Sequence, residues 1–244
     1  KHCPLCDKQD LEKFYEGIDN YYSQKFIQCS VCRNCSLIFL NPRPTKAEYQ
    51  EWYASVFQDK RKNYTSVAQV VQDIESKNKY ANKRKELEYF KNIVTEKSKC
   101  LDIGGGWGTL AKVVSDTFDC SVDIVEPSKL AARVAHEYFG LNAYNESFES
   151  FVEREQEKKK YDVIYAYHVF EHMADPNMFL ENVKKLLKPN TILLLALPNT
   201  AQPEKTSEHL FHIDHCFYYT PRTLGMMLNK HGFTIKKHGF ARMI

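Results

Sequence analysis

Four glycines at positions 104, 105, 106 and 108 give this chain a backbone segment suited to binding a ligand. They follow Asp102 in a short apolar run that begins at Cys100, and a helical pattern starts at Thr109. Glycine lets a ligand approach the backbone closely and tolerates positive φ. The first turn of a helix also presents N–H groups that have no intrahelical partner. A strand, a turn and a helix in this order are typical of a nucleotide-like cofactor site in an α/β protein.

The spacing of these glycines narrows the choice of cofactor. A dinucleotide fingerprint would need a third glycine at position 109, where the chain has Thr, and the Gly-Lys-Ser/Thr of a P-loop is absent. About twenty residues further on, the apolar run from Val122 to Val125 ends in Glu126. A carboxylate at the tip of the second strand can accept hydrogen bonds from both hydroxyls of a ribose. The pattern therefore predicts a cofactor that carries a ribose but is not a dinucleotide.

The cysteines form a second pattern with metal-binding spacing. Five of the eight lie in the first 35 residues, and they include the pairs Cys3-x-x-Cys6 and Cys32-x-x-Cys35. Two such pairs can supply the four thiolates of a closed tetrahedral Zn²⁺ site, whose role would be structural. Disulfides and free thiols are the alternatives, although no secretion signal favours disulfides. Cys29 also forms a C-x-x-C pair with Cys32, so it is a competing ligand.

Two acidic-histidine pairs are candidates for catalysis. Glu171-His172 follows an apolar run over residues 161–167, and Asp214-His215 lies in a histidine-rich stretch that also contains Glu208-His209 and His212. A neutral imidazole titrates in the range where it can take a proton from a hydroxyl, and a neighbouring carboxylate can orient the ring. The same four groups could instead bind a divalent metal that acidifies the hydroxyl.

Alternating strand and helix patterns surround these residues. We expect strands at 100–103, 122–125, 141–144, 161–167, 191–197 and from 233, and helices at 109 onward, 128–139, 148–158, 176–187 and 221–230. This alternation predicts an α/β, doubly wound, Rossmann-like parallel sheet.

With these motifs in place, the chain from about Lys99 onward resembles the class I S-adenosylmethionine-dependent methyltransferases. The segment from Cys35 to Pro44 resembles the second knuckle and following strand of methyltransferases with an N-terminal zinc ribbon, which favours Cys32 and Cys35 over Cys29 as ligands. Those relatives usually have glycine where this chain has Ser36. The resemblance implies a zinc ribbon over 1–44, a helical lid or linker over 45–98 and a catalytic domain over 99–244. It also implies a C-terminal hairpin that we expect to be truncated here.

The resemblance also implies which residues act. S-adenosylmethionine would be bound by residues at the tips of the strands, and the acidic-histidine pairs would be catalytic. The cofactor-binding set is Asp102, Gly104, Gly105, Gly106, Gly108, Glu126, Pro127, Ser147, Tyr167 and His168. The catalytic set is His215, His172, Glu171 and Asp214, and the structural Zn²⁺ set is Cys3, Cys6, Cys32 and Cys35. Among the aromatic side chains of the helical segment, Tyr53 and Tyr64 are candidates for roofing the cofactor.

Several functions agree with these features. The leading hypothesis is O-methylation of a small molecule, a nucleotide-linked sugar or a surface-polysaccharide precursor. The alternatives are an RNA methyltransferase with the ribbon as RNA-binding module, and a cofactor-binding partner subunit without catalysis. A net charge of +3 over 244 residues does not favour nucleic acid. No apolar run reaches the roughly 20 residues of a membrane span, and no signal peptide is visible, so we expect a cytoplasmic enzyme.

Overall fold

The structure, a computed structural model, describes residues 2–19, 25–45, 47–48, 64–203, 210–237 and 239. It divides into two compact units. Unit 1 comprises Lys1–Tyr49, Phe170–Glu181 and Leu197–Ile244, and unit 2 comprises Gln50–Val169 and Asn182–Ala196. The sequence after residue 169 therefore contributes to both units. The division into 1–44, 45–98 and 99–244 stays a prediction.

Unit 2 is built on a five-stranded sheet in the order β6-β5-β4-β7-β8, in which every neighbouring pair is parallel. Its strands are β4 (Lys99–Ile103), β5 (Ser121–Val125), β6 (Asn142–Tyr144), β7 (Tyr161–Tyr167) and β8 (Leu187–Ala196). The strand order reverses at β4, the position where open α/β sheets bind ligands. The predicted doubly wound parallel sheet is confirmed.

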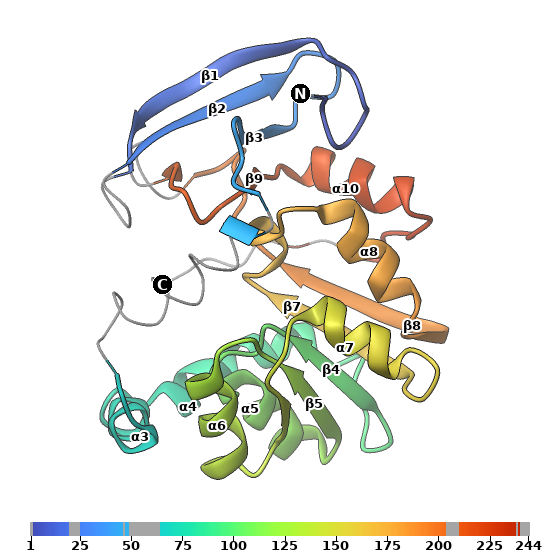
Figure 1. Cartoon of the computed structure of the whole chain (residues 1–244). Helices are drawn as coiled ribbons and strands as arrows, with labels where there is room; N and C mark the ends of the chain where they lie inside the picture. Colours follow the sequence, from blue (N-terminus) through green and yellow to red (C-terminus); the bar gives the residue numbers. More distant parts are fainter. Residues whose placement is uncertain are drawn as a thin grey trace. The chain divides into compact units, whose positions relative to one another are not determined.

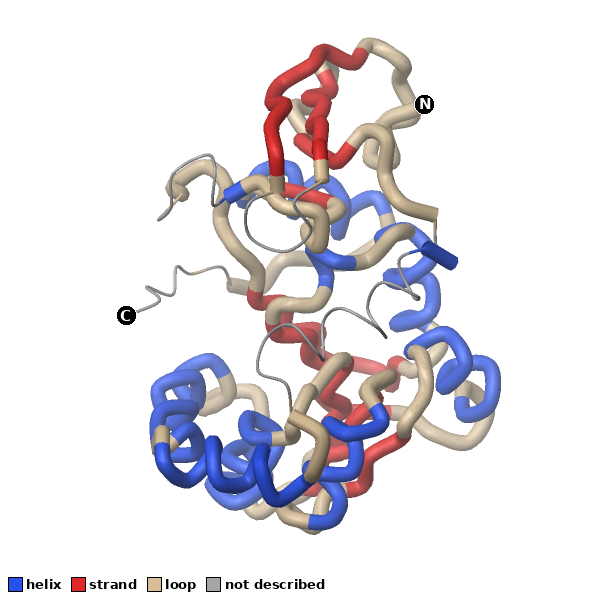
Figure 2. Tube along the Cα trace, turned by 60° about the vertical axis from the view of Figure 1, so that its left-hand side comes forward, coloured by secondary structure: helices blue, strands red, loops and turns tan. Residues whose placement is uncertain are grey.

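Helices alternate with these strands along the chain, as Figure 2 shows. In Figure 1, α5 (Thr109–Phe118) and α6 (Lys129–Glu137) lie on one side of the sheet, and α7 (Phe148–Glu155) lies on the other. The right-handed crossovers of parallel strands require this change of face when the strand order reverses. The central strands are covered on both faces, so β7 carries a run of fully buried side chains from Val163 to Ala166.

Two expected elements differ from the structure. The helix expected to reach Leu187 is α8 (Pro176–Lys184), and β8 already begins at Leu187. The chain becomes extended early because the Lys188 N–H donates to the hydroxyl of Thr191 at 2.7 Å, and Leu187 pairs with Tyr161 across a register shift. The strand expected from Phe233 is absent from residues 233–237, which pair with none of the described strands.

Residues 64–98 of the helical segment belong to unit 2, whereas its described residues 45, 47 and 48 belong to unit 1. The segment contains α3 (Val67–Ser76), α4 (Lys79–Asn82) and the 3₁₀ helix η2 (Lys83–Tyr89). The helix α3 begins where Ser66 accepts a hydrogen bond from the Gln69 N–H. Tyr53 lies outside the described residues. No helix in the described ranges is long and apolar enough to cross a membrane.

Unit 1 contains a four-stranded antiparallel sheet in the order β1-β2-β3-β9. The strands are β1 (Leu11–Ile18), β2 (Phe26–Cys32), β3 (Ile38–Leu40) and β9 (Phe217–Tyr218). The fourth strand comes from far along the sequence, so the sheet of the N-terminal segment is completed by residues outside 1–44. The 3₁₀ helix η3 (Phe170–His172) and α10 (Pro221–Lys230) also lie in this unit. A capping box between Thr220 and Thr223 starts α10 where the sequence predicts it.

Candidate functional site

The glycine turn after β4 has the backbone that its sequence predicts. Gly104, Gly106 and Gly108 all have positive φ, at 68°, 56° and 80°. A Cβ atom on Gly104 would lie 2.7 Å from the side chain of Val169, and one on Gly108 would lie 2.8 Å from Cβ of Ala135. Both conformation and space therefore require glycine at 104 and 108. A Cβ on Gly106 would meet nothing within 4 Å, so this glycine borders open space.

Glu126 lies directly after β5 and holds the turn from the side. Its Oε2 accepts a hydrogen bond from the Gly106 N–H at 3.0 Å, and its Oε1 accepts one from the Ser128 N–H at 2.8 Å. Burial raises the pKa of this carboxyl, while the two N–H donors act in the opposite direction. A carboxylate has about four lone-pair sites. Two of these sites are not used by the two backbone donors.

Asp102 lies beneath the same turn. Its side chain is buried, and a Cβ on Gly105 would come within 2.9 Å of its Oδ2 atom. Burial raises the pKa of Asp102 well above its usual value, and the neighbouring Tyr165 hydroxyl opposes that shift. The buried carboxyl therefore packs directly against the backbone of the turn at Gly105.

The other residues of the predicted cofactor set follow the remaining strands of this sheet. Pro127 accepts a hydrogen bond through its carbonyl from the Asn145 side chain at 2.9 Å, and Ser147 caps α7. Tyr167 is the last residue of β7. His168 has φ of 57°, and its N–H donates to the Ala196 carbonyl at 2.8 Å. These residues share the carboxyl edge of the sheet with the glycine turn.

The sequence predicts no function for two further residues at the turn, Trp107 and Lys79. Trp107 lies within the turn, in edge contact with Tyr64 at 5.6 Å between ring centres. The ammonium of Lys79 lies 4.2 Å from the centre of the Trp107 ring. Tyr64, a predicted roof residue, therefore packs on the glycine turn itself.

Unit 1 brings the two acidic-histidine pairs together. Oε1 of Glu171 lies 3.9 Å from Nε2 of His172 and 4.0 Å from Nε2 of His215. The Nδ1 atom of His172 lies 2.7 Å from the backbone carbonyl of Asp214. A carbonyl only accepts, so Nδ1 carries a proton, and in the neutral ring Nε2 has the lone pair. All four side chains are at most 14% exposed.

His212 is a member of this cluster that the predicted catalytic set omitted. Its Nδ1 atom is paired with Oδ1 of Asp214, and its ring centre lies 4.0 Å from that of His215. The sequence signal was the repeat of histidines at 209, 212 and 215, which left the assignment ambiguous. His209 lies outside the described residues. The cluster could also hold a metal ion. It contains two overlapping triads, and within each triad the donor atoms lie within 4.8 Å of one another: Glu171, His172 and His215, and His212, Asp214 and His215.

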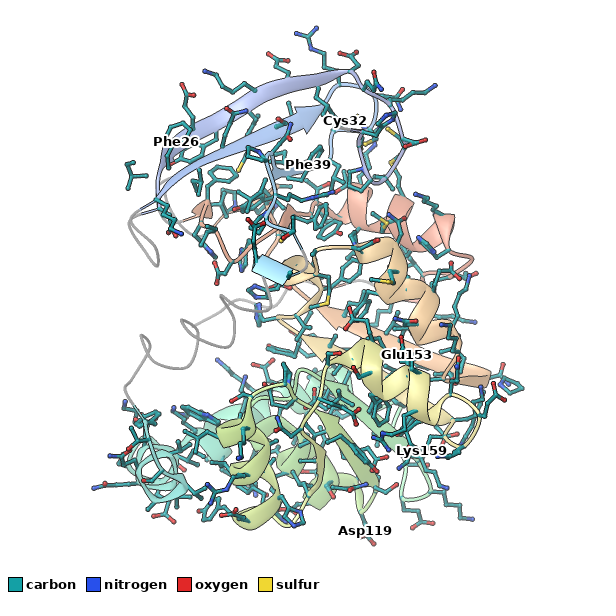
Figure 3. All side chains as sticks on the ribbon, viewed as in Figure 1. Phe26, Cys32, Phe39, Asp119, Glu153 and Lys159 are labelled. Atoms are coloured by element: carbon teal, nitrogen blue, oxygen red, sulfur yellow. The ribbon has the colours of Figure 1, made fainter. Side chains whose placement is uncertain are left out.

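The four predicted zinc ligands also converge in unit 1. The sulfur atoms of Cys3 and Cys35 are 3.5 Å apart, as are those of Cys6 and Cys32, and all four lie within 4.8 Å of one another. Figure 3 marks Cys32 at the end of β2. Zn–S bonds of about 2.3 Å in a tetrahedron would separate sulfur atoms by roughly 3.8 Å. The cysteine spacing therefore fits zinc.

The two halves of this cysteine cluster have the same backbone pattern. The N–H of Cys3 donates to the carbonyl of Lys8, and the Asp7 N–H donates back to the carbonyl of Cys3. In the second half the N–H of Cys32 donates to Leu37, and Ser36 donates back to Cys32. Asp7 and Ser36 have φ of 59° and 68°. Ser36 thus has the left-handed backbone that favours glycine.

Cys29 is not part of the cluster. It is fully buried beside Tyr218 in a small apolar core, where burial raises the pKa of its thiol to about 12. In β2 the side chains of Cys29 and Cys32 are three residues apart and point to opposite faces of the strand. Only Cys32 can therefore face the other three cysteines.

Comparison with known proteins agrees with this arrangement. Residues 48–238 match the family described as "Methyltransferase domain". The chain belongs to this methyltransferase family. The prediction of a class I methyltransferase is confirmed for family and fold. Two solved methyltransferases have a similar fold: one from Archaeoglobus fulgidus (TM-score 0.55, 16% identity, 64% of this chain and 69% of that one) and the plantazolicin methyltransferase BpumL (0.54, 18%, 75% and 72%).

Curated relatives of this methyltransferase match a shorter stretch. The mitochondrial ubiquinone biosynthesis O-methyltransferase of Schizosaccharomyces pombe is 30% identical over 119 residues, which is 45% of this chain and 43% of that protein. The ubiquinone biosynthesis O-methyltransferase of Pelagibacter ubique is 33% identical over 102 residues, or 41% and 42% of the two chains. The matched stretches span less than half the length of these curated relatives.

Proposed function

We propose that this methyltransferase uses S-adenosylmethionine to methylate a hydroxyl oxygen of a small molecule. The acceptor class that we favour is a nucleotide-linked sugar or a surface-polysaccharide precursor. The observation that carries the proposal is the buried cluster of Glu171, His172, Asp214 and His215, because it offers a base whose tautomer is fixed. Similarity to proteins named as O-methyltransferases supports oxygen as the acceptor atom.

The cofactor would lie on the glycine turn of unit 2. When bound, S-adenosylmethionine supplies an electrophilic methyl group on a sulfonium. Gly106 leaves room for it, and Glu126 retains two acceptor sites for the ribose hydroxyls. Pro127, Ser147, Tyr167 and His168 would line the same strand edge as further contacts.

The histidine cluster would handle the proton of the acceptor. A hydroxyl is a weak nucleophile near neutral pH, so a base that takes its proton as the C–O bond forms lowers the barrier. Because Nδ1 of His172 donates to the Asp214 carbonyl, Nε2 is the nitrogen of this ring that would take the proton. Glu171 lies at similar distances from His172 and His215 and would stabilise either ring once it is protonated.

The cysteine cluster would bind one structural Zn²⁺. Cys3, Cys6, Cys32 and Cys35 provide a closed set of four sulfur ligands, which leaves no position for water or substrate. The ion would fix the N-terminal segment of unit 1 and take no part in methyl transfer.

The direct test is a screen of nucleotide sugars and small hydroxylated acceptors, with release of S-adenosylhomocysteine as the readout. His172→Ala or His215→Ala should lower turnover roughly 10²–10⁴-fold if that residue is the base. His136→Ala, an exposed histidine on α6, is the matched control and should leave turnover unchanged. Full activity in both cluster variants would exclude His172 and His215 as the base. Methylation of RNA but of no small acceptor would overturn the acceptor class.

A chelator separates the base from a metal at the same cluster. The proposed base predicts unchanged turnover when a chelator is added to protein that retains its cysteine-bound zinc. Loss of activity under those conditions would instead favour a divalent ion held by Glu171, His172 and His215.

A further inference from the structure

We propose that a cavity at the amino edge of the parallel sheet binds a diphosphate group. The cavity has a volume of about 200 Å³, and every residue that lines it belongs to unit 2. Four of the lining side chains are lysines: Lys99, Lys158, Lys159 and Lys160. None of the four belongs to the proposed cofactor, catalytic or zinc residues.

Neighbouring strands bring these lysines together. Lys99 is the first residue of β4, and residues 158–160 directly precede Tyr161, the first residue of β7. The two strands are parallel neighbours, so their first residues lie at the same edge of the sheet. The N–H groups of Lys158 and Lys159 both donate to the Glu155 carbonyl, at 2.9 and 2.8 Å, which fixes the turn between α7 and β7. Figure 3 labels Lys159 in this turn.

Polar side chains at the same edge hold Lys159 in place. Its ammonium donates to Oδ2 of Asp123 at 2.8 Å and to the Tyr144 hydroxyl at 2.7 Å. The Tyr161 hydroxyl donates to the same oxygen of Asp123 at 2.7 Å. An ammonium has three N–H donors. Two are used among the described residues, so the third is available to a ligand.

The cavity carries an excess of positive charge. Its lining has four ammonium groups and one carboxylate, that of Asp123, which is paired with Lys159. The carboxylate of Asp162, near Lys99, accepts the Lys99 backbone N–H at 2.8 Å and is paired with a lysine of β8 at 2.8 Å. Across the described ranges, no ion pair or hydrogen bond involves the ammonium of Lys99 or of Lys158. The ligand that would balance this edge is therefore an anion.

The size of the cavity and the number of lysines narrow the choice of anion. Pockets that enclose drug-sized molecules have volumes of roughly 300–1,000 Å³, so the smaller volume here suits a compact group. A single ion pair at a solvated surface contributes little to binding. An anion held here needs several charges on separate oxygen atoms, because it must contact more than one ammonium at once. A diphosphate meets both requirements.

The cavity is separate from the proposed cofactor position. The strand β4 runs from Lys99 at the cavity to Ile103, and the glycine turn starts at Gly104. Five residues with a rise of about 3.3 Å each separate the two places by roughly 16 Å. A diphosphate would therefore bind at the opposite edge of the same sheet and would not compete with the cofactor.

Calorimetric titration of the full chain with inorganic pyrophosphate at low salt tests the inference. Lys99→Met and Lys158→Met should each weaken binding about fivefold, the upper range for an exposed ion pair. The double variant should bind more weakly than either. Lys158→Arg should bind like the wild type because the charge remains. Lys85→Met is the matched control and should also be unchanged, since Lys85 is an exposed lysine of η2 that does not line the cavity.

A second ligand, ADP, distinguishes two sources of the diphosphate. Comparable binding of ADP and pyrophosphate would support a diphosphate ester as well as the free anion, and binding of pyrophosphate alone would support the free anion. Binding of ADP alone would overturn the inference, because the nucleoside would then be the recognised group. Binding of an RNA oligonucleotide without binding of pyrophosphate would overturn it in favour of a nucleic-acid surface.

Three further outcomes would overturn the inference. The first is a wild type that does not bind pyrophosphate. The second is equal affinity of the wild type and the double variant, because the anion would then lie elsewhere. The third is competition between pyrophosphate and S-adenosylhomocysteine, which would place the anion at the glycine turn. Melting temperatures equal to that of the wild type should show that the lysine variants lose affinity and not their fold.

Discussion

The Gly106 N–H donates to Oε2 of Glu126 over 3.0 Å, so this buried carboxyl fixes the glycine turn. Its other oxygen accepts from Ser128 at the start of α6. One side chain therefore joins the segment after β4 to the segment after β5. This connection pre-organises the backbone that the cofactor would contact.

Glu126→Ala should weaken S-adenosylhomocysteine binding, because each lost charged hydrogen bond to a ribose hydroxyl is worth about 1.5–3 kcal/mol. It should also lower the free energy of unfolding, because Gly106 and Ser128 lose their acceptor. Calorimetric titration and urea unfolding measure the two effects separately. Glu137→Ala removes an exposed glutamate of α6 and is the control. Unchanged affinity in Glu126→Ala would rule out the ribose role.

Gly104→Ala should destabilise the protein more than Gly140→Ala. Both glycines have φ near 68°, so each variant pays about 1–2 kcal/mol for left-handed backbone. Only the Cβ at 104 also meets a neighbour, Val169 at 2.7 Å, whereas at 140 nothing lies within 4 Å. Urea unfolding of the two variants separates the clash from the backbone strain. Equal losses of stability would show that Val169 moves aside at no cost.

Removing a cluster cysteine should release the proposed zinc. Wild-type protein should contain about one Zn²⁺ per chain by elemental analysis. Cys32→Ser should lose the ion and lower the melting temperature, because metal binding is coupled to folding in such sites. Cys29→Ser is the control, since Cys29 packs beside Tyr218 away from the cluster. Zinc retained by Cys32→Ser and lost by Cys29→Ser would mean that the ligand set is wrong.

Asp102 should make the stability of the ligand-free protein fall as pH rises. Its folded-state pKa is raised well above the ordinary 3.8, so the folded state holds a proton that the unfolded state has released. The contribution of this group is complete below pH of about 4 and is lost as pH rises through the folded-state pKa. Asp102→Asn removes this dependence.

Melting temperatures from pH 5 to pH 8 test this prediction. Asp102→Asn should gain stability relative to wild type toward higher pH. Glu137→Gln, on exposed α6, should follow the wild-type curve. Parallel curves for Asp102→Asn and wild type would contradict a raised pKa at this position.

Much of this fold follows from local sequence. The strand at 161–167 and the helix at 221–230 form at the predicted bounds, because apolar runs and capping residues act over a few positions. The positive φ of Gly104 and Gly108 is equally local, whereas the close approach of Val169 and Ala135 to them is a tertiary contact. The end of α8 was missed because the pairing of Leu187 with Tyr161 overrides the local helix signal.

The sequence by itself determined which residue types follow which strands, and hence the family and the acidic-histidine and cysteine motifs. Only the tertiary structure decided which members of those motifs meet. It separated Cys29 from Cys32 and added His212 to the histidine cluster. These choices depend on packing between segments far apart in the chain, and spacing along a sequence does not encode the distance between such segments.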